Sequence, residues 1–328
     1  MEINQTLYQQ FAMSILNKTM VGFASTLSII GSLCIIITYI SYKDIRTSIR
    51  KIIVYKSFAD LFTAVVNFTA LYFKPKSKDV FCLVQSFISS ASLLCSLLWT
   101  MILAVFLFIT FVKEKHLLAN KLFPLFHVVC WGVPVIINCI AYAFNKLGNS
   151  KDAVSAGWCW ISTTDTNDVI LWMILDSKGI EIFSYIFLTV LYVWIKLHLN
   201  KMVEQEREIT PILQSQTVVV AHSLERKLMV IPLLFVFVRV WGTLRFIIFV
   251  YNIKHNKMEE LTLPDFQKFL ILMQGMGDNL QGAVNGFLFC YLTPKVYNHI
   301  KDSIFNCLSI NKTVVHKSIN INQNNLNC

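Results

Sequence analysis

Residues 80–112 read VFCLVQSFISSASLLCSLLWTMILAVFLFITFV, a run without one Lys, Arg, Asp or Glu. A bilayer core about 30 Å thick needs about 20 apolar helical residues to cross it. This run therefore predicts a membrane-spanning helix that is long enough to be tilted or to protrude from the bilayer. Other apolar runs of sufficient length lie at residues 20–42, 52–73, 122–145, 169–199, 227–252 and 265–292.

The whole chain has the composition of a membrane protein. Of its 328 residues, 55% are hydrophobic and only 15% are charged, against about 25% charged in an average soluble domain. A water-soluble fold could not cover so much apolar surface, whereas lipid can. We expect an all-α membrane protein, a seven-transmembrane helix bundle with the lipid bilayer as its partner. The net charge of +10 does not indicate nucleic acid, because the charges lie in short clusters between the apolar runs.

The Lys and Arg residues predict the orientation of the helices. The connections on one side, together with the C-terminal tail, carry 17 of the 29 basic residues, and the connections on the other side carry 9. Because basic connections stay in the cytoplasm, we expect a plasma-membrane protein with an extracellular N-terminus and a cytoplasmic C-terminus. The first inner connection contributes Lys43, Arg46, Arg50, Lys51 and Lys56.

The expected parts of the chain follow from these runs. Residues 1–19 form the extracellular N-terminus and residues 20–292 the transmembrane domain. Residues 293–307, with apolar and basic positions interleaved, predict an amphipathic helix on the inner leaflet. Residues 308–328 are Asn-rich and predict a disordered cytoplasmic tail.

Covalent modification is expected at a few positions. Asn4 and Asn17 each begin an Asn-x-Thr triplet on the outer side and are candidate glycosylation acceptors. Cys307, at the end of the amphipathic segment, is a palmitoylation candidate, with an unmodified thiol as the alternative. Cys82 and Cys159 are the two cysteines predicted to face the oxidising outside, so we expect a disulfide between them rather than two free thiols. The chain has no C-x-x-C pair or Cys/His cluster with metal-site spacing, and we expect no metal and no cofactor.

Ionisable residues inside the spans are the most informative feature. Each costs about 2.5–3.5 kcal/mol near the bilayer centre, so these side chains must face a polar interior. Arg239 and Asp278 lie at matching depth in the sixth and seventh runs and are expected to pair. Lys178 and Glu181 are three residues apart on one helix and could also pair. Arg245 lies about as deep as Asp176, its expected partner.

These charges either lock the helices together or line a ligand pocket. We assign the structural role to an interhelical polar network: Asp60, Arg239, Asp278, Asn279, Gln281 and Asn285. We assign the ligand-facing role to the outer half of the bundle: Asp176, Lys178, Glu181, Arg245, Trp158 and Trp160. A cationic outer cavity would favour a small anionic or zwitterionic ligand. Pro134 and Pro232 are expected to kink their helices.

Five ordered stretches carry a resemblance to a known family. They are FHVVCWGVP at 126–134, GWCWI at 157–161, RKLMVIPL at 226–233, RVWGTLRF at 239–246 and QGAVN at 281–285. With seven runs and the Cys82 and Cys159 arrangement, the chain resembles a G-protein-coupled receptor on the cyclic-AMP-receptor-like and secretin-like side of the superfamily. The rhodopsin-like signatures are missing, since the third run is not followed by Asp-Arg-Tyr and the seventh does not end in Asn-Pro-x-x-Tyr.

The resemblance implies an orphan receptor, in the sense that the sequence does not identify its ligand. It would relay an extracellular stimulus to a heterotrimeric G protein through a cytoplasmic cleft between the third, fifth and sixth spans. The candidate contacts with the G protein are basic residues that otherwise only set topology: Arg46, Arg50, Lys113, Arg226 and Lys227. The alternative is a transporter or channel that uses the buried charges as an ion path. An enzyme is not expected, because the chain has no H-E-x-x-H or G-x-S-x-G motif.

Overall fold

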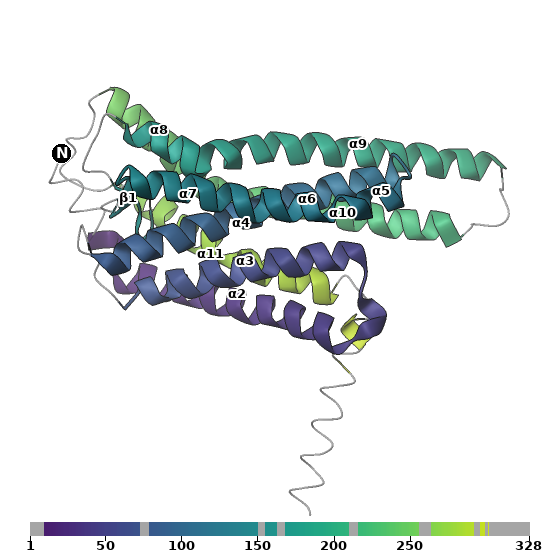
Figure 1. Ribbon diagram of the computed structural model, residues 1–328, viewed down its shortest axis with the longest axis horizontal. Coiled ribbons are helices and arrows are strands. Elements are labelled where there is room, and N and C mark those ends of the chain that lie inside the picture. The colour runs from purple at the N-terminus through teal and green to yellow at the C-terminus, as the bar shows by residue number, and fades with distance from the viewer. Residues whose placement is uncertain are drawn as a thin grey trace, which may run out of the picture.

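The structure is a computed structural model. It describes residues 10–72, 79–149, 155–162, 168–209, 216–255, 264–291, 296–298 and 301, without the side chains of residues 203, 205–233 and 291. Long helices lie side by side along one axis (Figure 1). In chain order the elements are α2 (Ile15–Ser41), the 3-10 turn η1 (Lys43–Ile45), α3 (Ser48–Ala70), α4 (Val80–Phe111), α5 (His116–Lys121), α6 (Phe123–His127), the π-helical turn η2 (Val128–Gly132), α7 (Val133–Ala143), β1 (Leu147–Gly148), β2 (Trp160–Ile161), α8 (Val169–Met173), the π-helical turn η3 (Ile174–Lys178), α9 (Gly179–Ile209), α10 (Gln216–Lys254) and α11 (Asp265–Tyr291).

Side-chain caps explain where three of the long helices begin. The side chains of Ser14, Thr47 and Asp79 accept hydrogen bonds from the first turns of α2, α3 and α4. Such caps satisfy backbone N–H groups that the helix itself leaves unpaired. Because Ser14 caps α2, this helix starts before residue 20, where the first apolar run was predicted to begin.

Six helical segments of the described chain are long and apolar enough to cross a membrane, judged by length and composition alone. They are Ile15–Ser41, Ser48–Ala70, Val80–Phe111, Phe123–Ala143, Val169–Met202 and Leu234–Lys254. Large apolar side chains such as Phe23, Phe62 and Ile186 point outward on these helices, as lipid-facing residues do. The bundle is therefore a membrane helical bundle.

The predicted seventh span corresponds to α11, which does not belong to these six. It is 27 residues long, but it carries Gln274, Asp278, Asn279 and Gln281, and all four are buried inside the bundle. A helix with a polar inner stripe is less apolar on average than a helix that buries only hydrocarbon.

The helix α4 lies at the centre of the bundle. It has the largest buried share of the six spans, and it packs against α3, α7 and α9. The core around Trp99, Leu103 and Leu107 joins α4 to α9 and α3. The uncharged run at 80–112 is thus buried by protein as much as by lipid.

The helices α2 and α11 pack closely through glycines. A Cβ atom on Gly31 would lie 2.6 Å from the carbonyl oxygen of Gly282, and one on Gly286 would lie 2.7 Å from the Cα of Gly31. Small residues let helix backbones approach closely in membranes. This pair of helices forms a backbone-to-backbone seam along one side of the bundle.

One expectation about helix ends was wrong. Residues 200–209 and 216–226 lie between the predicted spans at 169–199 and 227–252 and were therefore expected in a cytoplasmic loop. They instead continue α9 and α10, since Lys, Glu and Gln are good helix formers whatever their polarity. Both helices extend beyond their neighbours at the end of the bundle away from the N-terminus (Figure 1). Before Pro134 the chain changes to π-helical bonding in η2, which accommodates a residue without an N–H.

The predicted amphipathic helix at 293–307 is described only at residues 296–298 and 301, where Val296 is buried against Ile35 and Phe289. The predicted tail at 308–328 lies outside the described residues.

Candidate functional site

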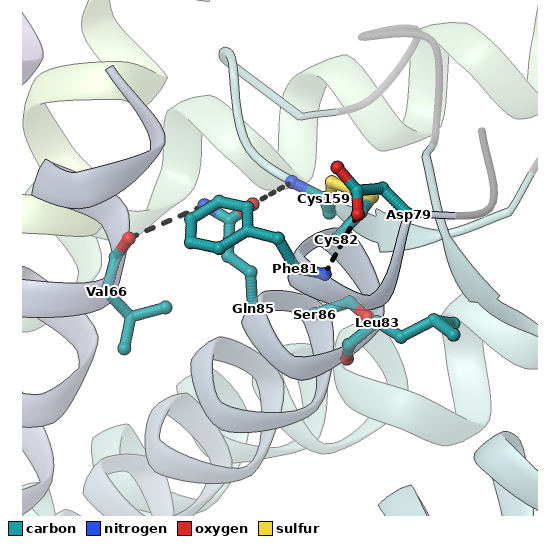
Figure 2. Close-up of a disulfide and its surroundings, with 8 residues drawn as sticks. All are labelled: Val66, Asp79, Phe81, Cys82, Leu83, Gln85, Ser86 and Cys159. Atoms are coloured by element: carbon teal, nitrogen blue, oxygen red, sulfur yellow. Dashed lines mark hydrogen bonds between the residues drawn. A yellow bond between two sulfur atoms is a disulfide. The ribbon is translucent and has the colours of Figure 1, made fainter. Parts of the chain in front are cut away.

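The outer connection after α7 is fastened to α4 by a disulfide. Cys82 in the first turn of α4 is bonded to Cys159, with 5.5 Å between their Cα atoms, so the predicted bridge is present. Figure 2 shows Gln85 beside it. The Gln85 side chain accepts a hydrogen bond from the Cys159 N–H at 3.3 Å and donates one to the Val66 carbonyl at 3.4 Å. One amide thus ties the connection, α4 and α3 together.

A short hairpin then places Trp160 over the bundle. β1 and β2 pair antiparallel, with Gly148 opposite Trp160. The indole Nε1–H of Trp160 donates to the Asp176 carboxylate at 2.6 Å. The Ser90 hydroxyl of α4 donates to the same carboxylate oxygen. Asp176 is fully buried, and it therefore joins the hairpin to α4 and η3.

Beneath this hairpin lies a polar cavity inside the bundle. Its wall is built by α4, the outer connection, η3, α9, α10 and α11. The lining residues are Ser89, Ser90, Leu93, Ser155, Trp158, Trp160, Ser177, Lys178, Glu181, Arg239, Gln274 and Asp278. Two cations and two anions thus face one another among hydroxyl groups and indole rings.

A π-helical turn gives the fifth span its place in this wall. In η3 the N–H of Gly179 bonds to the carbonyl of Ile174, five residues earlier. A Cβ atom on Gly179 would lie 2.8 Å from that carbonyl oxygen, so the turn depends on the missing side chain. π-Helical turns insert one extra residue and often occur at functional sites. This turn brings Ser177 and Lys178 to the cavity.

Glu181 is the best-satisfied charge in the cavity. Its carboxylate accepts hydrogen bonds from Lys178 Nζ at 2.8 Å, from the Tyr185 hydroxyl at 2.7 Å and from the Thr243 hydroxyl at 2.7 Å. The predicted pairing of Lys178 with Glu181 is present. Tyr185 and Thr243 were not predicted, because neutral hydroxyl residues in apolar runs give no signal of their partners.

Arg239 and Asp278 also pair as predicted, but loosely. Arg239 Nη1 lies 3.7 Å from Asp278 Oδ1, while Gln274 donates to the other carboxylate oxygen at 3.2 Å. Both residues line the cavity, although only a structural role was expected for them.

Arg245 has neither the partner nor the place in the cavity wall that were predicted for it. Its Nη1 donates to the Ser155 carbonyl at 3.0 Å and to Gln274 Oε1 at 2.5 Å, and the contacts of Asp176 are with Ser90 and Trp160. Arg245 is not among the residues that line the cavity. Similar depth in two spans did not bring the two charges together, because helix rotation also decides which side chains meet. Over the described residues, the cavity wall is consequently balanced in charge rather than cationic.

The remaining polar network lies deeper in the bundle. Asp60 accepts from Lys56 at 3.0 Å, from Asn285 at 2.6 Å and from Ser96 at 2.5 Å. Lys56 was counted with the inner connection, but it is buried within α3. Its spacing of four residues from Asp60 was the signal that could have revealed the pair.

Two further network predictions concern α11. Asn279 accepts a hydrogen bond from Asn67 of α3 at 2.9 Å, so this residue does connect helices. Gln281 is buried, and its side-chain oxygen has no hydrogen-bond partner within the described part of the chain. Among the described residues no group of His, Cys, Asp and Glu is arranged to hold a metal ion.

Known proteins are similar to this sequence over most of its length. Human G-protein coupled receptor 157 is 32% identical over 286 residues, which cover 85% of this chain and 81% of the human protein. This chain belongs to the G-protein-coupled receptors. The mouse receptor 157 is 31% identical over 289 residues, with 85% and 83% of the two chains covered. A family model described as the slime mold cyclic AMP receptor matches residues 9–170 of our receptor.

A further relative lies on the cyclic-AMP-receptor-like side. Cyclic AMP receptor-like protein A of Dictyostelium discoideum is 36% identical over 145 residues, 43% of our receptor and 36% of the relative. These relatives confirm the predicted receptor family and do not favour the transporter or channel. They point to a receptor rather than an enzyme.

At the end of the receptor opposite the hairpin, two candidate G-protein contacts hold the turn between α2 and α3. Arg46 donates to the carbonyls of Tyr39 and Ile40 at 3.1 and 2.5 Å, and Arg50 donates to that of Ile45 at 2.7 Å. Lys113 is exposed after α4. Arg226 and Lys227 lie in the first part of α10, for which the structure does not describe side chains.

The modification candidates fare differently. Asn17 is buried, and its side-chain nitrogen donates to the carbonyls of Ala12 and Ala156 at 2.7 and 2.9 Å. A glycan would be attached at this nitrogen, so the prediction for Asn17 was wrong: the residue fastens the N-terminal segment to the outer connection. Asn4 and Cys307 lie outside the described residues.

Proposed function

We propose that the receptor crosses the plasma membrane seven times, with α11 as the seventh passage, its N-terminus outside and its C-terminus in the cytoplasm. The length of α11 is sufficient to span about 30 Å. Its buried polar stripe explains why it falls short in apolar composition. The excess of Lys and Arg on the inner connections supports the orientation.

We further propose that the outer cavity receives a small ligand and that a heterotrimeric G protein binds at the opposite end. The observation that carries this proposal is the convergence of α4, α9, α10 and α11 on one charged cavity beneath the disulfide-linked connection. A ligand that contacts several helices at once can favour one arrangement of those helices over another. The long inner extensions of α9 and α10 would transmit the rearrangement to the partner.

The decisive experiment is a screen of G-protein subtypes with the purified full-length receptor in lipid nanodiscs. Nucleotide exchange is measured for each subtype, with and without candidate ligands. Cyclic AMP is included because the matching family model is described as a cyclic AMP receptor. Exchange that requires the receptor supports coupling. Folded receptor that leaves exchange on every subtype at the rate of empty nanodiscs would contradict it.

The topology is tested separately with epitope tags at the two termini. We expect antibody to reach the N-terminal tag on intact cells and the C-terminal tag only after permeabilisation. Equal access to both tags on intact cells would exclude an odd number of passages, and with it the seventh passage through α11.

A further inference from the structure

We propose that the cavity binds a small zwitterion, with the anionic group of the ligand at Arg239 and its cationic group at Asp278. The inference rests on the proposed function, because it takes this cavity as the ligand site of the receptor. It begins from two atoms that face each other unsatisfied. Arg239 Nη1 and Asp278 Oδ1 are 3.7 Å apart, and neither has a hydrogen-bond partner among the residues that the structure describes.

Burial makes these two atoms costly. Arg239 is 2% exposed and Asp278 is 6% exposed, so bulk water does not solvate them. A buried donor or acceptor left unpaired costs about 1–3 kcal/mol, and a charged one costs more. The Nε of Arg239 is likewise unpaired within the described chain. The pair therefore offers N–H donors to an anion and an oxygen to a cation or donor at one point of the cavity wall.

The neighbouring charges narrow the class of ligand. Lys178 and Glu181 satisfy each other at 2.8 Å, and Tyr185 and Thr243 occupy the other Glu181 oxygen. This second pair has no strong need for a ligand. It leaves Arg239 and Asp278 as the groups with capacity to spare.

Charge balance then separates a zwitterion from a simple ion. Among the residues that the structure describes, the cavity wall carries two cations and two anions. Asp176 and Arg245, buried beside the cavity, add one charge of each sign. A ligand with net charge would leave an uncompensated charge inside the bundle, where charges are expensive. A zwitterion that binds Arg239 with its anionic group and Asp278 with its cationic group leaves the total charge unchanged.

The remaining wall suits such a ligand. Ser89, Ser90 and Ser177 present hydroxyls that can donate or accept. Trp158 and Trp160 line the same space, and an indole ring is the aromatic face that attracts a cation most strongly. These features suit a small zwitterion better than a fatty acid or an amine.

The test uses the full-length receptor in nanodiscs and three matched probe series. The zwitterions are glycine, β-alanine and 4-aminobutanoate; the anions are acetate, propanoate and butanoate; the cations are methylamine, ethylamine and propylamine. Binding is read from thermal unfolding and from the fluorescence of the cavity tryptophans at constant ionic strength. We expect at least one zwitterion to bind ten times more tightly than both of its matched single ions.

Two variants test the assignment of the charges. Arg239→Gln should remove the advantage of the carboxylate, so that the zwitterion binds no better than the amine. Asp278→Asn should remove the advantage of the ammonium group, so that the zwitterion binds no better than the matched acid. Because a single change in a buried pair can unfold the chain, the double variant Arg239→Gln/Asp278→Asn, which leaves neither charge unpaired, is compared with both. It should fold and lose the preference for zwitterions.

Each outcome decides the inference. If every zwitterion binds no better than its matched acid or amine, or if the double variant keeps the preference, the inference is overturned and water occupies the gap. G-protein exchange on the same samples separates the two proposals. Activation by an anion such as cyclic AMP without zwitterion binding would overturn the inference and leave the receptor function standing. Zwitterion binding without exchange on any subtype would do the reverse.

Discussion

The ammonium group of Lys56 lies 3.0 Å from the carboxylate of Asp60, one turn later on α3, and both side chains are buried. Asn285 of α11 and Ser96 of α4 donate to the same carboxylate. Three helices thus meet at one ion pair in the interior of the receptor. Buried ion pairs are costly to break, because removal of one partner leaves the other charge uncompensated.

We therefore expect Lys56→Met to destabilise the receptor by about 3–5 kcal/mol. The double variant Lys56→Met/Asp60→Asn should recover a large part of that loss, because it leaves no unpaired charge. Inactivation half-lives at a fixed temperature in nanodiscs rank the variants, since many large and disulfide-bonded proteins unfold irreversibly and their stability is then observed as a rate. A single variant as long-lived as the wild type would show that the pair is solvated and not a lock.

The disulfide gives a second prediction. Cys82→Ser should release the outer connection from α4 and lower the apparent melting temperature. The loss of stabilising free energy should fall below the usual value of about 2–4 kcal/mol for a disulfide, because the membrane already restrains both ends of the loop. Ligand-dependent G-protein activation should fall more than stability does, since Trp158 and Trp160 reach the cavity from this connection.

The matched control for the disulfide is Cys139→Ser, which changes a free and exposed cysteine in α7. Its apparent melting temperature and activation should equal those of the wild type. Equal behaviour of Cys82→Ser and Cys139→Ser would mean that the bridge does not position the connection.

Much of the bundle could be predicted because a membrane span can be recognised from the length of an apolar run in the sequence. An apolar run of sufficient length must be helical in lipid, since every backbone group has to be satisfied within the segment. The positions of Lys178 and Glu181 on one helix also fix their separation, so this pair was found. Cys82 and Cys159 could be paired because few cysteines face the oxidising side.

The rest of the site depends on helix rotation and on local departures from α-helical bonding. The depth of Arg245 matched that of Asp176, yet its side chain reaches Gln274 instead. The π-helical turn η3 shifts the residues before Gly179 relative to α9, and no apolar pattern signals such a turn. The wrong glycosylation site has the same origin: the Asn17 triplet is genuine, but folding buries its amide.

Gly179 gives the third prediction. Gly179→Ala should close the π-helical turn, because the added Cβ would lie 2.8 Å from the Ile174 carbonyl oxygen. A return from π-helical to α-helical bonding would rotate the preceding segment by about 100° relative to α9. This rotation would move Ser177 and Lys178 away from the cavity. We expect near-normal surface expression and at least a tenfold loss of ligand potency in the exchange assay.

Gly132→Ala is the control for this change. Gly132 belongs to the other π-helical turn, and a Cβ there would meet no atom within 4 Å. Its potency should match the wild type. Equal potency for Gly179→Ala and Gly132→Ala would refute the role of η3 in shaping the cavity.

The seam between α2 and α11 gives the last prediction. Gly31→Ala would place a methyl group 2.6 Å from the Gly282 carbonyl oxygen and 2.9 Å from the Ala283 Cα. Both atoms belong to backbone, so the helices must separate, and overpacking of this kind costs about 1–3 kcal/mol. Gly22→Ala is the matched control on the same helix, because its nearest neighbour is the flexible end of the Leu71 side chain at 3.3 Å. We expect a clear fall in the half-life of Gly31→Ala in nanodiscs and little change for Gly22→Ala. Equal half-lives for the two variants would mean that α2 and α11 can separate at little cost, and that their close packing does not stabilise the bundle.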